Sequence, residues 1–144
     1  MKSRHFLQAV DHDRIVAAIA AAEKQTSGEI RVYVSKRKRK EVLAYARRRF
    51  TKLKMHRLPH RNGVLIFLAP LTHRFAVVGD TEIHTKCGDD FWKEVIAVME
   101  PLLKQGQFTE GIVQAVEKVG AILAKHFPPK AGDQHNLPDS VIEE

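Results

Sequence analysis

The apolar positions recur with two different periods along the chain. A spacing of three to four residues, which gathers apolar side chains on one face of a helix, indicates helical segments. We expect them over residues 11–25, 41–55, 83–86, 89–102 and 109–127. The two proline residues that follow position 127 end the last helix, because proline cannot continue the backbone hydrogen bonds.

Three shorter segments have the patterns of β-strands. Residues 29–35 alternate strictly, with Ile30, Val32 and Val34 on one face. Residues 63–69 are continuously apolar, which is typical of a central strand covered on both faces. A turn at Pro70 separates that segment from a return strand over residues 73–78.

The order of these elements predicts a three-layer α/β/α sandwich around a short mixed sheet. The first two strands are joined through a helix, so we expect them to be parallel, with a right-handed crossover. The second and third strands form an antiparallel hairpin. We place the domain over residues 10–127, and the polar composition of residues 128–144 predicts a disordered C-terminal tail.

Several residues are predicted to start or end these elements. Asp11 and Thr109 are suited to cap the first and last helices, and Gly28 to end the first helix in a left-handed conformation. Pro101 is expected to kink or shorten its helix near the end. Phe91 and Trp92 open the same helix and are expected in the core rather than on a stacking surface.

Charge is distributed unevenly along the 144 residues. The net charge is +7, yet residues 36–61 contain twelve Lys or Arg and one acid, which leaves −4 for the rest. A segment of this kind can bind nucleic acid, an anionic lipid or an acidic protein. The candidate polyanion-binding residues are Lys36, Arg37, Lys38, Arg39, Arg47 and Arg48.

The remaining composition restricts the class of protein. Cys87 is the single cysteine, which excludes an internal disulfide and a thiolate metal cage. No stretch of the chain reaches the roughly 20 apolar residues of a membrane span, and no signal peptide is evident at the N-terminus. We therefore expect a cytoplasmic domain.

The predicted topology brings several polar residues to one edge of the sheet. Glu29 opens the first strand, Arg61 and Asn62 precede the second, and Asp80 follows the antiparallel third strand. Asp89 comes shortly afterwards. Oxygen atoms of Asp80 and Asp89, supported by Glu29 and Asn62, could bind a hard cation such as Ca²⁺ or Mg²⁺. Arg61 could bind a phosphate through a fork of hydrogen bonds.

Structural explanations of these residues remain open alongside the cation site. Asp80 and Asp89 are suited to cap helices, Glu29 could pair with a nearby arginine, and Asn62 could belong to a turn. The pattern of a calcium-binding loop, with alternating acids and a closing glutamate, is absent.

Two further chemistries are weakly indicated. His56 and His60 have a spacing that could bind zinc on a helix, but Pro59 lies between them and no third ligand is evident. Cys87 lacks a clear histidine partner and is expected to be an inert, partly buried thiol.

Three segments resemble the TPM domain family. They are Thr26-Ser-Gly-Glu-Ile-Arg-Val32, Arg61-Asn-Gly-Val-Leu-Ile-Phe-Leu-Ala69 and Arg74-Phe-Ala-Val-Val-Gly-Asp80, and the later Gly88-Asp-Asp-Phe-Trp92 and Gly106-Gln-Phe-Thr-Glu-Gly-Ile112 are similar to its compact bacterial branch. The resemblance implies an α/β/α sandwich. It also implies an ill-defined activity, since some plant members are described as acid phosphatases and some bacterial members bind calcium.

Two hypotheses follow for the function. The first is a TPM-type domain that binds a divalent cation or a small anion at this edge and has weak, metal-dependent phosphatase activity. The second is a non-catalytic module that binds a polyanion or an acidic partner through residues 36–61.

Overall fold

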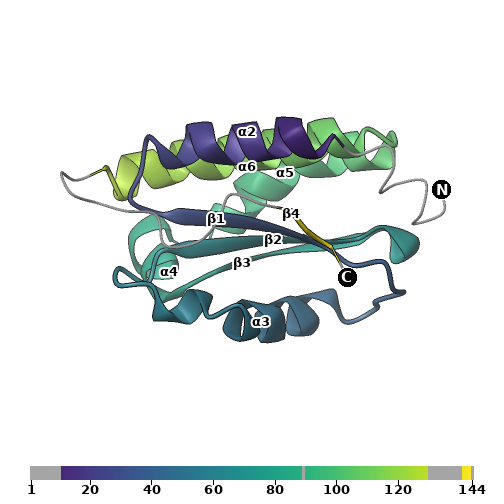
Figure 1. Ribbon diagram of the computed structural model, residues 1–144, viewed down its shortest axis with the longest axis horizontal. Coiled ribbons are helices and arrows are strands. Elements are labelled where there is room, and N and C mark those ends of the chain that lie inside the picture. The colour runs from purple at the N-terminus through teal and green to yellow at the C-terminus, as the bar shows by residue number, and fades with distance from the viewer. Residues whose placement is uncertain (1–10, 89, 130–140, 144) are drawn as a thin grey trace.

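A four-stranded mixed sheet lies between two layers of helices in the computed structural model, which describes residues 11–88, 90–129 and 141–143 (Figure 1). The strand order is β3-β2-β1-β4. The strands span Glu29–Val34 (β1), Gly63–Ala69 (β2), Arg74–Gly79 (β3) and Val141–Glu143 (β4). β1 is parallel to both β2 and β4, and β2 and β3 form an antiparallel hairpin, as the sequence predicted.

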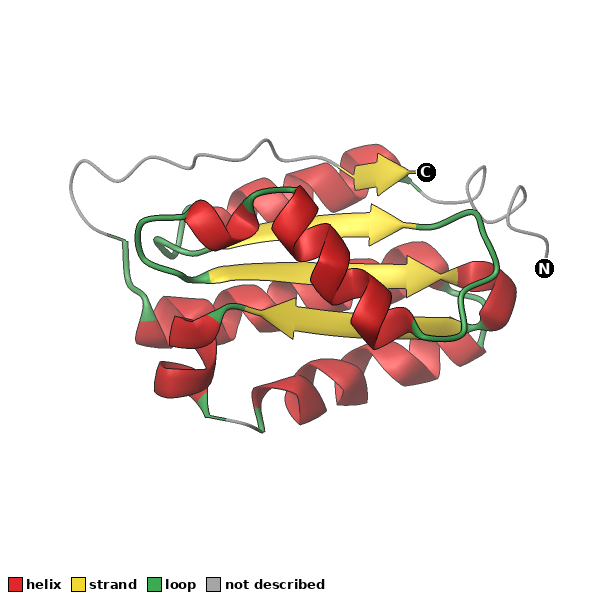
Figure 2. Cartoon of the chain, turned by 90° about the horizontal axis from the view of Figure 1, so that it is seen from below, coloured by secondary structure: helices red, strands yellow, loops and turns green. Residues whose placement is uncertain are grey.

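Helices cover both faces of this sheet and complete the predicted α/β sandwich. The helices α2, α5 and α6 form one layer, and α3 crosses the opposite face (Figures 1 and 2). Their bounds are His12–Glu23 (α2), Val42–Lys52 (α3), Thr81–Cys87 (α4), Phe91–Lys104 (α5) and Phe108–His126 (α6). Two single 3₁₀ turns, Met55–Arg57 and Pro70–Thr72, lie in the connections on either side of β2.

The sheet therefore has an apolar core on each side. Ile30, Val32 and Val34 of β1 face α2, α5 and α6, whereas Tyr33 packs with Phe67 beneath α3. β2 is buried along its whole length, which explains its continuous apolar sequence. The alternation in β1 does not expose its polar face, because Glu29, Arg31 and Tyr33 are also buried.

Burying Arg31 among charged neighbours perturbs its titration. Removal from water lowers the pKa of the Arg31 guanidinium, and the nearby carboxylates of Glu29 and Glu23 oppose that change. The Glu23 side chain also accepts a hydrogen bond of 2.8 Å from the backbone N–H of Ile30. Charged groups on the polar positions of β1 are thus part of the interior.

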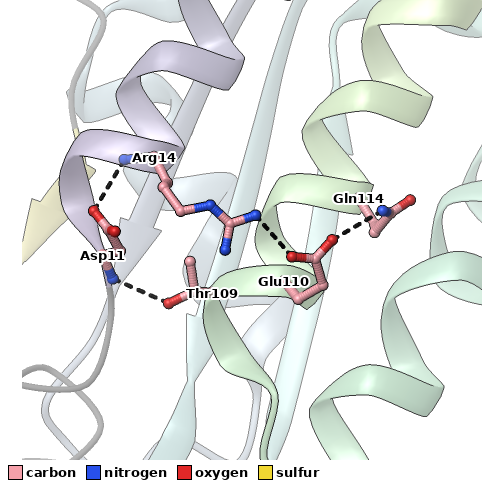
Figure 3. A network of polar contacts seen from close by, with 5 residues as sticks. All are labelled: Asp11, Arg14, Thr109, Glu110 and Gln114. Atoms are coloured by element: carbon pink, nitrogen blue, oxygen red, sulfur yellow. Dashed lines mark hydrogen bonds and ion pairs between the residues drawn. The ribbon is translucent and has the colours of Figure 1, made fainter.

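The first turns of α2 and α6 are joined by a polar network (Figure 3). The Asp11 carboxylate caps α2 by accepting a hydrogen bond from the N–H of Arg14, at 3.1 Å. The Arg14 guanidinium reaches Glu110 at 2.8 Å, and Gln114 donates to the same carboxylate at 3.1 Å. These contacts confirm the predicted Asp11 cap and fix α2 against α6.

Two predictions about helix ends are wrong. Thr109 does not cap α6, which begins at Phe108; its hydroxyl accepts a hydrogen bond from the N–H of Asp11 instead. Gly28 has no left-handed conformation. It is needed for space, because a Cβ there would lie 2.8 Å from the Leu123 side chain and 3.2 Å from the Asn62 carbonyl oxygen. Pro101 lies inside α5, which continues to Lys104, and the kink expected there stays a prediction.

The C-terminal segment contains a strand that the sequence did not predict. Val141–Glu143 form β4 beside β1, with Val141 packed on the core beneath α2 and Ile142 on the core beneath α3. Asp89, a predicted cap or cation ligand, lies outside the described residues. Asp90 precedes α5 without capping it and forms an ion pair of 3.1 Å with Lys93.

Candidate functional site

The edge of the sheet where β1 and β2 begin is organised by an ion pair between an accessible arginine, Arg61, and a buried aspartate, Asp80. Nε and Nη2 of Arg61 donate to the two carboxylate oxygens of Asp80, each at 2.7 Å. Only 4% of the Asp80 side chain is exposed, against 46% for Arg61. The hydrogen bonds to this carboxylate raise the pKa of Arg61. Arg61 and Asp80 thus form a bidentate ion pair, whose two parallel hydrogen bonds fix the orientation of both groups.

Backbone hydrogen bonds draw the polar residues of this edge together. The N–H of Glu29 donates to the Asn62 carbonyl at 3.3 Å, and the N–H of Asp80 donates to the Gly63 carbonyl at 3.1 Å. Glu29, Asn62 and Asp80 consequently lie at one edge, where the topology placed them. Arg61 has φ 50°, an unusual conformation for a residue with a side chain, and its carbonyl accepts a hydrogen bond from the N–H of Glu82.

The geometry offers little support for a cation at these residues. Both oxygens of Asp80 accept hydrogen bonds from Arg61, and one also accepts the N–H of Thr81 at 2.7 Å, so Asp80 caps α4. The Asn62 amide donates to the Ser27 hydroxyl. Within residues 11–88, 90–129 and 141–143, no three His, Cys, Asp or Glu side chains form a metal-binding group. The four-residue site that includes Asp89 stays a prediction.

A cleft of about 380 Å³ opens beside the Arg61–Asp80 pair. Its basic side chains come from three parts of the chain, namely the loop before β2, α4 and the end of α6. The lining residues are Ser27, Pro59, His60, Arg61, Glu82, Lys86, His126, Phe127 and Pro128. Lys86 extends over the Phe127 ring at 4.9 Å from its centroid. Four basic side chains thus face one acid, Glu82.

Sequence reasoning found Arg61 but missed most of this cleft. His60 was considered only as a zinc ligand with His56, and Lys86 and His126 had no distinguishing motif. Lys86 and His126 are 40 positions apart, so only the packing of α4 against α6 brings them together. His56 does not line the cleft, and its Nδ1 atom is buried without a hydrogen-bond partner in the part of the chain described.

The basic segment forms a second polar cluster around one tyrosine. The guanidinium carbons of Arg39, Arg49 and Arg48 lie 3.9, 5.0 and 5.5 Å from the centre of the Tyr45 ring. Arg39 and Arg49 both donate to the Tyr45 hydroxyl, at 3.0 Å and 2.7 Å. Lys36, Arg37, Lys38, Arg47 and Arg48 are exposed, whereas Arg39 is half-buried against the ring. Positive charge is therefore concentrated near the C-terminal end of β1 and along α3.

The family comparison identifies the class of protein to which this chain belongs. The model of the TPM domain matches residues 1–122, which is most of the chain. The chain belongs to the TPM domain family. No curated protein matches it significantly.

Two solved structures have the same architecture. The NMR structure of the BA42 protein from the psychrophilic bacterium Bizionia argentinensis is 40% identical over 92% of each chain, with a TM-score of 0.86. The N-terminal domain of a protein from P. gingivalis is 15% identical, with a TM-score of 0.60 over 79% of this chain and 76% of that one. The second similarity concerns the fold alone. In the described ranges, no helix is both long and apolar enough to cross a bilayer.

Proposed function

We propose that this TPM domain binds phosphate-type anions in the cleft beside the Arg61–Asp80 pair and weakly hydrolyses phosphate monoesters there. The observation that carries the proposal is the gathering of His60, Arg61, Lys86 and His126 around one cleft that contains a single acid. A concave cationic site attracts and concentrates anions.

Arg61 is suited to the binding role because its position is fixed while it stays accessible. A guanidinium has five N–H donors, and the two bonds to Asp80 occupy two of them. The remaining donors belong to a side chain that is 46% exposed. Because Asp80 holds the guanidinium in place, an anion would pay little conformational entropy to engage it.

Hydrolysis needs a proton donor or acceptor in addition to positive charge. Imidazole is the side chain that most readily exchanges a proton near neutral pH, and His60 and His126 both line the cleft. We assign them the acid–base role in the proposal. A divalent cation bound by Asp80, Asp89, Glu29 and Asn62 is a separate hypothesis that the same experiment can test.

The experiment is a two-dimensional amide NMR titration with sulfate, whose charge does not change between about pH 5.5 and about pH 8. We expect saturable shifts around residues 59–62, 82–86 and 126–128. Lys86→Ala should weaken binding about tenfold, as expected for one hydrogen bond to a charged group. Lys125→Ala, a change at an exposed lysine of α6 that does not line the cleft, is the matched control.

Phosphate-ester hydrolysis is measured on para-nitrophenyl phosphate, with added Ca²⁺ or Mg²⁺ and with a chelator. Activity that falls in Lys86→Ala and His126→Ala but not in Lys125→Ala supports the proposal. Absence of sulfate shifts at both pH values contradicts anion binding. Shifts from Ca²⁺ or Mg²⁺ confined to the residues near Glu29, Asn62 and Asp80 would support the cation hypothesis.

The arginine cluster at Tyr45 favours a second candidate function, binding of a polyanion by the basic segment. Three guanidinium groups within 5.5 Å of one ring concentrate charge, and five further basic side chains of residues 36–48 are exposed. Binding of a labelled single-stranded oligonucleotide should weaken steeply as salt rises, because phosphate contacts release counterions. No binding at low salt would eliminate this function.

A further inference from the structure

The two edges of the sheet differ in whether another strand pairs with them. β4 covers the outer edge of β1 at Val32–Val34, whereas β3 pairs with β2 alone and forms the opposite edge (Figure 2). An uncovered edge presents unpaired N–H and C=O groups to any extended segment that reaches it. β3 is therefore the edge where another strand could be added.

The register identifies which backbone groups of β3 point outward. Asp80 lies opposite Gly63 and donates to its carbonyl, so this is a hydrogen-bonded pair of the antiparallel ladder. Such pairs alternate with pairs whose backbone groups point away from the partner strand. The N–H and C=O groups of Phe75, Val77 and Gly79 consequently face the open edge. None of the backbone hydrogen bonds that join loops, turns and caps in the described part of the chain involves these three residues.

A groove follows this edge. A cavity of about 270 Å³ is floored by residues 75–79 and walled by Leu43 and Arg47 of α3 and by His84, Trp92 and Ile96 of α4 and α5. A second cavity, of about 110 Å³, continues from Phe75 past His73 to Lys104. Leu43 is 45% exposed, the one large apolar side chain so exposed in the described part of the chain. The groove thus combines open backbone groups with apolar walls.

Beyond the exposed Arg74 at its start, β3 lacks the features that usually protect a sheet edge. Residues 75–79, Phe-Ala-Val-Val-Gly, contain no lysine, no proline and no charge. The groove along this edge is lined by α3 on one side and by α4 and α5 on the other, and residues 76–78 of the strand are themselves buried. A single extended segment fits between such walls better than the sheet edge of a second folded copy, whose own flanking helices would meet them.

The charges of the groove indicate which segment it accepts. Glu100 and Lys104 line its far end and neutralise each other in an ion pair of 3.3 Å. Arg47 lines the near end and takes part in no ion pair between described residues. We propose that the groove along β3 docks an extended peptide of another protein by strand addition, with alternating apolar residues against its walls and an acidic residue beside Arg47.

The proposal is tested with a capped heptapeptide of alternating valine and threonine that has an acidic residue at each end. In amide NMR of the full chain, we expect saturable downfield shifts at Phe75, Val77 and Gly79, and slower hydrogen exchange at those three amides. The same peptide with N-methylated valines cannot form the ladder and should not bind. A peptide with lysine ends should bind at least about tenfold more weakly.

Variants of α3 separate docking from non-specific contact. Leu43→Glu and Arg47→Glu should each weaken the acidic heptapeptide about tenfold or more. Lys52→Glu, an exposed change on the same helix outside the groove, should not. The proposal would be overturned if all three variants bound the peptide equally well, if the N-methylated peptide bound as tightly as the parent peptide, or if no peptide bound at all. Concentration-dependent shifts at the three amides without peptide would identify a second copy as the occupant and also overturn it.

Discussion

A buried carboxylate needs donors, and Asp80 has three of them. Two come from the Arg61 fork and the third from the N–H of Thr81, all at 2.7 Å. Hydrogen bonds to an ionised group are stronger than those between neutral groups. A cation at Asp80 would have to displace the guanidinium or share the carboxylate with it. An anion in the cleft would not have this competition, because it would bind the N–H donors of Arg61 that Asp80 does not use.

Cys87 is predicted to be a slow nucleophile. Burial raises the pKa of its thiol, an effect that the adjacent Lys86 opposes only in part, so the reactive thiolate is scarce near neutral pH. Alkylation by iodoacetamide at about pH 7.5 should be slower in the folded protein than in the same chain unfolded in urea. Mass spectrometry after timed quenching measures both rates. Equal rates would show that the site is open and not buried.

Glu110 should make the stability of the α2–α6 junction depend on pH. Its hydrogen bonds from Arg14 and Gln114 lower the pKa of its carboxyl group. A lowered folded-state pKa means that the stabilisation is present above the unfolded-state pKa and is lost as the pH falls through the folded-state value. Glu110→Ala should therefore be less stable than the parent near neutral pH, and the difference should shrink under acid conditions.

Urea unfolding at about pH 7 and about pH 3 gives this comparison directly. Glu41→Ala, an exposed acid on the opposite side of the sheet, serves as the control and should show no such dependence. A difference that persists at low pH would mean that Glu110 acts through packing of its side chain instead.

Among the elements, α2 and α6 approach each other closely at Gly120. A Cβ at that position would lie 2.6 Å from the Cβ of Ala22. Ala22 has no rotatable side chain with which to relieve the contact, so Gly120→Ala should force the helices apart. Overpacking costs typically about 1–3 kcal/mol, which outweighs the roughly 1 kcal/mol that alanine gains over glycine in a helix.

A double-mutant cycle measures this contact. Ala22→Gly alone should lose about 1 kcal/mol of stability, but combined with Gly120→Ala it should restore the space between the helices. The double variant should then be more stable than the sum of the single changes by at least about 0.5 kcal/mol. Additive changes in the free energy of unfolding would contradict direct contact at this position.

Element order and strand direction were predictable because apolar periodicity reports burial directly. The crossover from β1 to β2 and the hairpin into β3 follow from connection lengths and chain chirality. Helix ends were less predictable, since they depend on neighbours distant in sequence. Gly28 shows this: Leu123 and Asn62 explain its glycine, and neither is close along the chain.

The candidate site was predictable only where strand ends defined it. Glu29, Asn62 and Asp80 meet because of sheet topology, which the sequence pattern reveals. Lys86 and His126 enter the cleft through helix packing, which no local pattern reports. Likewise, the strand β4 is too short and too polar in its surroundings to differ from a tail until its partner β1 is considered.

At the scale of the whole molecule, the sheet is completed at one edge by its own C-terminal segment and left open at the other. The TPM domain model ends at residue 122, before β4 begins. β4 contributes two partly buried side chains, Val141 and Ile142, one to each core. The domain should consequently fold without it, while β1 loses the cover on its outer edge.

Deletion of residues 130–144 tests this division. We expect a folded protein that is less stable by roughly 2 kcal/mol, because burial of a valine or isoleucine side chain contributes about 1.5–3 kcal/mol when complete and less when partial. The urea midpoint should fall, and hydrogen exchange should accelerate at the β1 residues that pair with β4, Val32 to Val34. Ile142→Ala in the full chain should reproduce part of the loss. If the truncated chain unfolds, β4 contributes more stability than we expect. If it keeps the parent's urea midpoint and the protection of β1, β4 contributes less.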